Sequence, residues 1–102
     1  MTKVNLKQRG QQYTVSCKGH ATGSPEVCAA VSCLIYTLAG WLHNASVLVL
    51  QERLEDGDAL IQYHGGAAAE TAFDMICVGF LQLEQEYGSY ISVDFAAERK
   101  FL

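Results

Sequence analysis

The sequence is poor in charge and in basic residues. Of its 102 residues, only 18% are Asp, Glu, Lys or Arg, whereas a soluble domain usually carries about 25%. Such a thinly charged surface suggests that a partner covers part of the apolar surface. Seven Lys and Arg stand against eleven Asp and Glu, which gives a formal net charge of −4. A nucleic-acid-binding protein needs Lys and Arg to neutralise phosphates, so the composition argues against that class.

We expect neither a secretory signal nor a membrane span in this chain. Residues 1–9 carry charges but no apolar core, unlike a secretory signal. The longest apolar stretch runs from residue 27 to residue 42. It is interrupted by Ser32, Thr37 and Gly40, so it falls short of the ~18 apolar residues needed to span a bilayer. We therefore expect a cytosolic protein without membrane contact.

Four cysteines are present, but the spacing that would pair them on a metal is missing. Thiols stay reduced in the cytosol, so no disulfide is expected. No Cys-x-x-Cys pair occurs, and Cys28 and Cys33, five residues apart on a helix, would point to different faces. We therefore expect no metal and no other cofactor. Free cysteines are most often buried, and this is the expectation for Cys17, Cys33 and Cys77.

The length fits one domain with one hydrophobic core, over residues 1–102. Half of the residues are hydrophobic, so the chain should fold. Apolar residues that alternate predict strands, and apolar residues three or four apart predict helices. The expected strands are 4–9, 12–18, 46–53, 59–64 and 89–95, and the expected helices are 25–44 and 67–87. This ββαββαβ order predicts an α+β fold, a largely antiparallel sheet with two helices packed on it. The charged residues 98–100 are expected to be exposed.

The first helix has a strong start signal. Ser24 is a favourable N-cap, Pro25 suits the first helical position, and Glu26 places a negative charge at the positive end of the helix dipole. Cys28 then falls at the first turn, where unpaired backbone N–H groups and the dipole favour a thiolate. First-turn amides, including that of Cys28, could also hold an oxyanion.

His20 lies in the loop just before this helix, eight residues from Cys28. That separation lets the imidazole fold back over the helix start. In a Cys–His pair the imidazole takes the thiol proton and then stabilises the thiolate. From the residues and their spacing alone, two interpretations stay open. One is a cysteine nucleophile activated by histidine, and the other is a buried cysteine below a solvated histidine.

The sequence around the pair resembles a known family. Gly-His-Ala at residues 19–21, followed by Cys-Ala-Ala-Val-Ser at residues 28–32, is similar to the ribosomal-processing cysteine protease family Prp. Residues 58–66, which end in Gly-Gly, and residues 81–91 are also similar to that family. The resemblance therefore covers nearly the whole chain.

The resemblance implies a bacterial cysteine endopeptidase that forms homodimers and removes an N-terminal extension from a ribosomal protein. It implies that His20 is the general base and Cys28 the nucleophile. A loop between them would cover a protein or peptide substrate. The substrate loop expected here, counted from the residue before His20, consists of Gly19, Ala21, Thr22, Gly23 and Ser24.

Two features depart from the family pattern. The loop between His20 and Cys28 is shorter, and Pro25 stands where the family usually has an acidic residue. Glu26 is a candidate to orient the imidazole instead, and Ser32 could help to close the site or bond a carbonyl one turn back. The short loop suggests a divergent branch encoded by a phage or prophage, whose substrate would be a virion protein. The alternative to an enzyme is a non-catalytic dimeric binding or assembly module with this fold.

Overall fold

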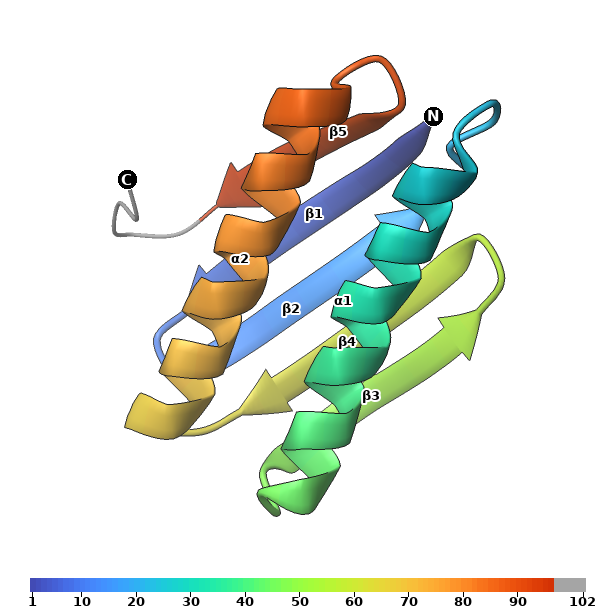
Figure 1. Cartoon of the computed structure of the whole chain (residues 1–102). Helices are drawn as coiled ribbons and strands as arrows, with labels where there is room; N and C mark the ends of the chain where they lie inside the picture. The colour runs from blue at the N-terminus through green and yellow to red at the C-terminus, as the bar shows by residue number, and fades with distance from the viewer. Residues whose placement is uncertain (97–102) are drawn as a thin grey trace.

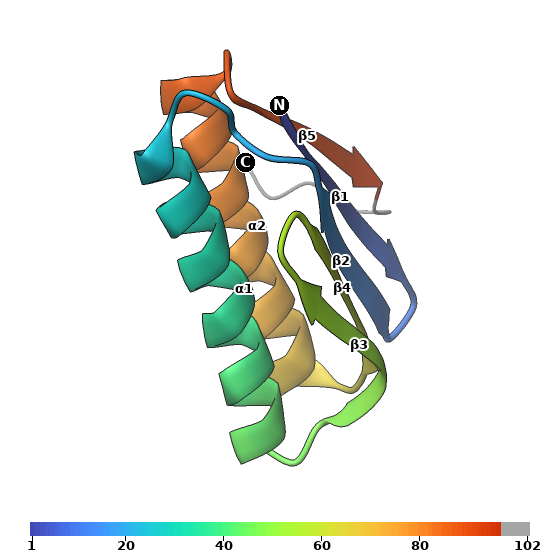
Figure 2. The ribbon, with the colours of Figure 1, turned by 90° about the vertical axis from the view of Figure 1, so that its right-hand side faces the viewer.

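The chain forms a single sheet with both helices on the same face, as the two views of the ribbon show (Figures 1 and 2). The computed structural model describes residues 1–96, so the charged residues 98–100 lie outside the described part. The elements are β1 (Thr2–Arg9), β2 (Gln12–Lys18), α1 (Pro25–Asn44), β3 (Leu48–Glu55), β4 (Asp58–His64), α2 (Ala67–Tyr87) and β5 (Ile91–Ala96). The predicted ββαββαβ order and the α+β class are confirmed.

The five strands lie in the order β3-β4-β2-β1-β5. Three neighbouring pairs are antiparallel, and β1 pairs with β5 in parallel because the chain returns through α2. The predicted largely antiparallel sheet is therefore confirmed. The third strand starts and ends two residues later than expected, because Glu55 pairs with Asp58 and leaves only Asp56 and Gly57 for the turn.

The core lies between the sheet and the helices. Every second residue of the central strands faces the helices and is buried, including Val4 and Leu6 on β1 and Val15 on β2. At its centre the ring of Tyr13 stacks on the ring of Tyr63, with the centroids 5.2 Å apart. The alternation of buried and less buried residues along the strands is the period of two that predicted them. One face of the sheet is covered by the helices and the other faces solvent.

Helix α1 begins as its residues dictate. The Ser24 hydroxyl accepts a hydrogen bond from the backbone N–H of Val27 at 3.3 Å, and Pro25 is the first helical residue. By length and mean hydropathy (20 residues, 1.4) α1 could cross a membrane, although the sequence suggested an interrupted run. A core helix passes the same test, and α1 packs Ile35, Leu38 and Leu42 into the core. Only 28% of its most apolar stretch is buried, so much apolar surface of α1 faces outward.

The expectation for one cysteine was wrong. Cys17 and Cys77 are buried as expected, but Cys33 is exposed and its sulfur lies 4.0 Å from the Thr37 hydroxyl. At ~100° per residue, Cys33 lies ~200° around the helix from the buried Ile35. The position of Cys33 on the helix directs its side chain away from the core, although free cysteines are usually buried.

One buried hydroxyl gives a stability prediction. Tyr63 is fully buried, and within residues 1–96 its hydroxyl has no hydrogen-bond partner. Burial raises the pKa of this hydroxyl, so it stays neutral. We expect Tyr63→Phe to raise the free energy of unfolding by ~1 kcal/mol, because it removes an unsatisfied buried group. Urea unfolding monitored by circular dichroism measures the change.

Tyr13→Phe is the matched control. The Tyr13 hydroxyl donates to the carbonyl of Gly65 at 3.4 Å, so its removal should lower the free energy of unfolding by ~0.5–1 kcal/mol. A Tyr63→Phe variant that loses as much stability as Tyr13→Phe would show that the Tyr63 hydroxyl has a partner in solution.

Candidate active site

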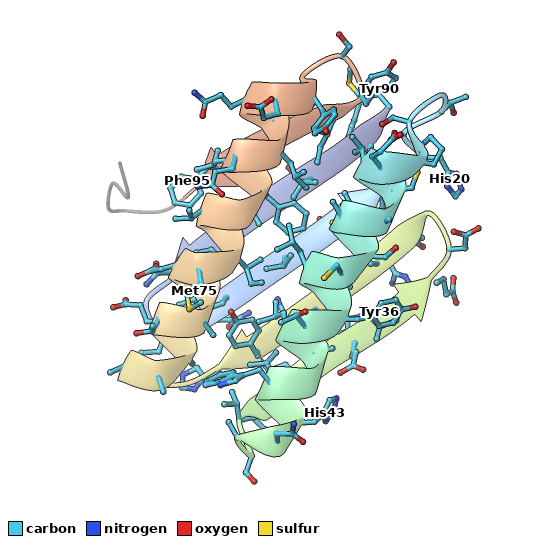
Figure 3. All side chains as sticks on the ribbon, in the orientation of Figure 1. His20, Tyr36, His43, Met75, Tyr90 and Phe95 are labelled. Atoms are coloured by element: carbon cyan, nitrogen blue, oxygen red, sulfur yellow. The ribbon has the colours of Figure 1, made fainter. Side chains whose placement is uncertain are left out.

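A cavity of about 170 Å³ lies where the start of α1, the loop after β2 and the β3–β4 turn meet. Both His20 and Cys28 line it. Apolar side chains from β2, α1, β3 and β4 form part of its wall, namely Cys17, Ile35, Leu54 and Ala59. The turn and the strand ends beside it add three carboxylates, those of Glu55, Asp56 and Asp58. Figure 3 shows His20 at this end of the molecule.

Cys28 is the fourth residue of α1 and is partly buried. Its sulfur lies 3.8 Å from the carbonyl oxygen of Ala21, so the thiol donates back to the loop. Its backbone N–H donates to the carbonyl of Ser24 at 3.2 Å. In the structure described this amide makes the first hydrogen bond of the helix itself, and its role as an oxyanion donor stays a prediction.

The loop between His20 and Cys28 is a tight turn. The backbone N–H of Ser24 donates to the carbonyl of Ala21 at 2.9 Å, and both residues are buried. Thr22 and Gly23 between them are exposed, and Gly23 has a φ of +92°, which favours glycine. Gly19 lines the cavity. Of the expected substrate loop, Gly19, Thr22 and Gly23 are exposed, and Ala21 and Ser24 hold the turn together.

His20 is exposed, and its ring lies against Gly57 of the β3–β4 turn. Within residues 1–96 it makes no hydrogen bond, either to Cys28 or to a carboxylate. The fold therefore brings the imidazole and the thiol to one cavity, while the thiol donates its hydrogen bond to the carbonyl of Ala21.

The two expected supporting residues do not reach the imidazole. The carboxylate of Glu26 accepts a hydrogen bond from the Ser24 hydroxyl at 3.1 Å, which draws it toward the cap. Ser32 lines the cavity one turn after Cys28, is exposed, and has no hydrogen bond within the described residues. Neither side chain orients His20 in this structure.

The β3–β4 turn was missed by the sequence reasoning as part of the site. The Arg53 guanidinium donates two hydrogen bonds of 3.0 Å to Asp58 and lowers the pKa of that carboxyl. The turn reaches the cavity because β4 pairs with β2, with Lys18 opposite Asp58. Nothing local in the sequence signals that pairing. Within residues 1–96, no three His, Cys, Asp or Glu side chains form a cluster that could hold a metal ion.

A family comparison agrees with the resemblance of the sequence. The model of the family described as "Cysteine protease Prp" matches residues 1–92. No curated protein matches the chain.

Solved structures share the fold over nearly the whole chain. An essential ribosomal processing protease Prp from S. aureus, with a covalently linked product peptide, has a TM-score of 0.81 at 19% identity, covering 93% of this chain and 99% of that one. SMU.848 from Streptococcus mutans has a TM-score of 0.75 at 22% identity, covering 96% and 99%. The S. aureus protease with a substrate peptide gives 0.73 at 16% identity, covering 93% and 99%.

The four thiols should differ in reactivity. Burial raises the pKa of the Cys17 thiol to about 12, so at pH 8 only about one molecule in 10⁴ carries this thiolate. Cys77 is fully buried, whereas Cys33 is exposed and Cys28 lines the cavity. We expect iodoacetamide to label Cys28 and Cys33 in the native protein and to spare Cys17 and Cys77. Peptide mass mapping measures each site.

Labelling in denaturant is the control, because all four thiols should then react at similar rates. Native labelling of Cys17 at the rate of Cys33 would contradict the burial that the structure gives to this thiol.

Proposed function

Because the chain belongs to the cysteine protease Prp family, we propose that it is a cysteine endopeptidase with a protein or peptide substrate. The observation that carries the proposal is the shared cavity. Cys28 reaches it from the first turn of α1, and His20 reaches it from the loop after β2. A thiol beside an imidazole at a helix N-terminus is the arrangement that a sulfur nucleophile needs.

The reaction needs one rearrangement of the site. The Cys28 thiol must leave the carbonyl of Ala21 and give its proton to His20. The imidazole is exposed and makes no hydrogen bond within the described residues, so it can accept the proton from the sulfur without breaking a bond of its own. Catalytic contacts that are open in the free enzyme commonly close when substrate binds.

The chemistry then follows in two steps. The Cys28 thiolate attacks the scissile carbonyl carbon, the C–N bond breaks, and the imidazolium of His20 protonates the leaving amine. Water, deprotonated by the same imidazole, attacks the thioester, and the thiol is regenerated with release of the acid. No metal or organic cofactor takes part in this scheme.

For the substrate we propose a ribosomal protein precursor from which an N-terminal extension is removed in the cytosol. The resemblance of the sequence supports it, and two similar structures are of a ribosomal processing protease with peptide bound. If the gene belongs to a phage, the corresponding substrate is a virion protein precursor.

Substitution of the two residues tests the function. We expect Cys28→Ala to abolish cleavage, because the nucleophile is lost, and His20→Gln to lower kcat by ~10²–10⁴, because no general base remains. Purified ribosomal and virion precursors are incubated with each variant, and new N-termini are mapped by mass spectrometry. Circular dichroism checks that each variant is folded.

Cys33→Ala is the matched control, since this thiol is exposed and does not line the cavity. It should cleave at the wild-type rate. Cleavage by Cys28→Ala at the wild-type rate would exclude Cys28 as the nucleophile.

The second candidate is a binding module that does not cleave. It is favoured by the bond from the Cys28 thiol to Ala21 and by the short loop. Such a module would bind the precursor with the same Kd in the wild type and in Cys28→Ala, and no new N-terminus would form in either.

The proposal includes a homodimer that covers an apolar groove between α1 and α2. The groove has a volume of about 410 Å³, and no charged side chain of residues 1–96 lines it. Its walls include Trp41 of α1, 37% exposed, and Met75 of α2, 69% exposed. Large exposed apolar patches are uncommon on monomers. A second copy related by twofold symmetry would bring the same patch to meet it.

A charge placed in the groove tests the dimer. We expect Met75→Lys to convert the dimer to a monomer, because the interface would bury an unpaired charge. Analytical ultracentrifugation measures the mass. Leu48→Lys is the control, since Leu48 is 61% exposed on the edge strand β3 and lies outside the groove. A wild-type monomer, or a dimer that survives Met75→Lys, would contradict this interface.

A further inference from the structure

Two hairpin turns of the sheet each contain a glycine with a left-handed backbone. Gly10, in the turn between β1 and β2, has a φ of +56°, and Gly57, in the turn between β3 and β4, has a φ of +71°. Glycine adopts this conformation at no steric cost, so the backbone alone explains both residues.

The surroundings of the two glycines differ. A Cβ built on Gly10 would meet no atom of residues 1–96 within 4 Å. A Cβ built on Gly57 would overlap Nε2 of His20, and it would lie 2.8 Å from Cε1 and 3.1 Å from Cδ2 of the same ring. Non-bonded carbon atoms pack best at about 3.5–4.0 Å. The imidazole therefore rests on the bare Cα of Gly57, and a side chain there would displace it.

The backbone beside the ring is tied to the same turn. The N–H of Gly19 donates to the carbonyl of Gly57 at 2.9 Å. Gly19 is itself closely packed, since a Cβ there would lie 2.6 Å from the carbonyl oxygen of Met1. The turn cannot move back from the ring without straining this bond. Because His20 makes no hydrogen bond within residues 1–96, packing sets the position of its ring.

We propose that Gly57 is a positioning residue for the reaction. Gly57 lines the same cavity as Cys28, and it acts by giving the His20 imidazole a bare surface there. The proposal rests on the proposed role of His20 as the general base. A displacement of ~1 Å in a catalytic group can cost ~10²-fold in rate. A side chain at position 57 should therefore lower kcat at least about tenfold.

Gly57→Ala and Gly10→Ala form a matched pair. Both place alanine in a left-handed turn, so both should lower the unfolding midpoint by similar amounts. Only the methyl group at position 57 reaches His20. We expect kcat for precursor cleavage to fall at least about tenfold in Gly57→Ala and to stay within about twofold in Gly10→Ala. The limb of the pH–rate profile that reports the base should shift in Gly57→Ala alone. Wild-type kcat and an unchanged profile in Gly57→Ala would overturn the proposal.

A second readout does not depend on cleavage. In the wild type and in Gly10→Ala, proton NMR should show a nuclear Overhauser contact between Hε1 of His20 and Hα of Gly57. If the wild type cleaves no precursor, the proposed function fails. The positioning role of Gly57 is then tested by the pH dependence of Cys28 alkylation, measured in a Cys33→Ser background. A shift of that dependence in Gly57→Ala but not in Gly10→Ala supports the positioning role, and identical profiles overturn it.

Asparagine keeps the test valid if Gly57→Ala does not fold. Asparagine tolerates a left-handed backbone better than alanine and carries the same Cβ. The pair Gly57→Asn and Gly10→Asn is then compared by the same measurements, with the same outcomes for and against.

Discussion

The site depends on one backbone hydrogen bond, from the N–H of Gly19 to the carbonyl of Gly57. It extends the β2–β4 ladder by one step beyond its last pair, Lys18 and Asp58. By doing so it joins two segments that lie far apart in the sequence, the loop that carries His20 and the turn on which the imidazole rests. Without the β2–β4 pairing, Cys28 would still lie at a helix start, but the acidic turn would be missing from its cavity.

The thiol makes a weak bond in the structure described. A thiol is a poor donor, and its bond to the carbonyl of Ala21 is long, at 3.8 Å. A hydrogen bond between a thiolate and an imidazolium is charge-assisted and stronger. Exchange of the first bond for the second would therefore cost little. Backbone groups that start the helix cannot change partners so easily, because each belongs to the hydrogen-bond ladder of α1.

Local signals in the sequence were enough to predict the helices. The cap at Ser24 and the proline after it fixed the start of α1, and apolar spacing gave α2 its observed bounds. The same local reasoning placed Cys28 in the first turn. The prediction for Cys33 was wrong, because it rested on the usual burial of free cysteine and not on the position of this residue around the helix.

The rest of the site comes from pairings that no local pattern records. Glu26 was considered as a partner for His20, yet it lies two residues from Ser24 and bonds that hydroxyl instead. Asp56 and Gly57 lie between the predicted strands 46–53 and 59–64, but the contact of Gly57 with His20 follows only from the strand order. The His20 imidazole makes no hydrogen bond within the described residues, so packing positions it. Packing between residues far apart in the sequence cannot be predicted from the spacing of residues along the chain.

Charge links the sequence to the proposed substrate. A net charge of −4 argued against binding to nucleic acid, but it favours binding to a protein that itself binds nucleic acid and must therefore be rich in Lys and Arg. The carboxylates at the cavity are not equivalent, because Asp58 is paired with Arg53. Glu55 and Asp56 remain exposed at the rim and can attract a basic chain. Electrostatic attraction would thus act on the precursor as a whole, while the apolar wall of the cavity would contact the residues next to the scissile bond.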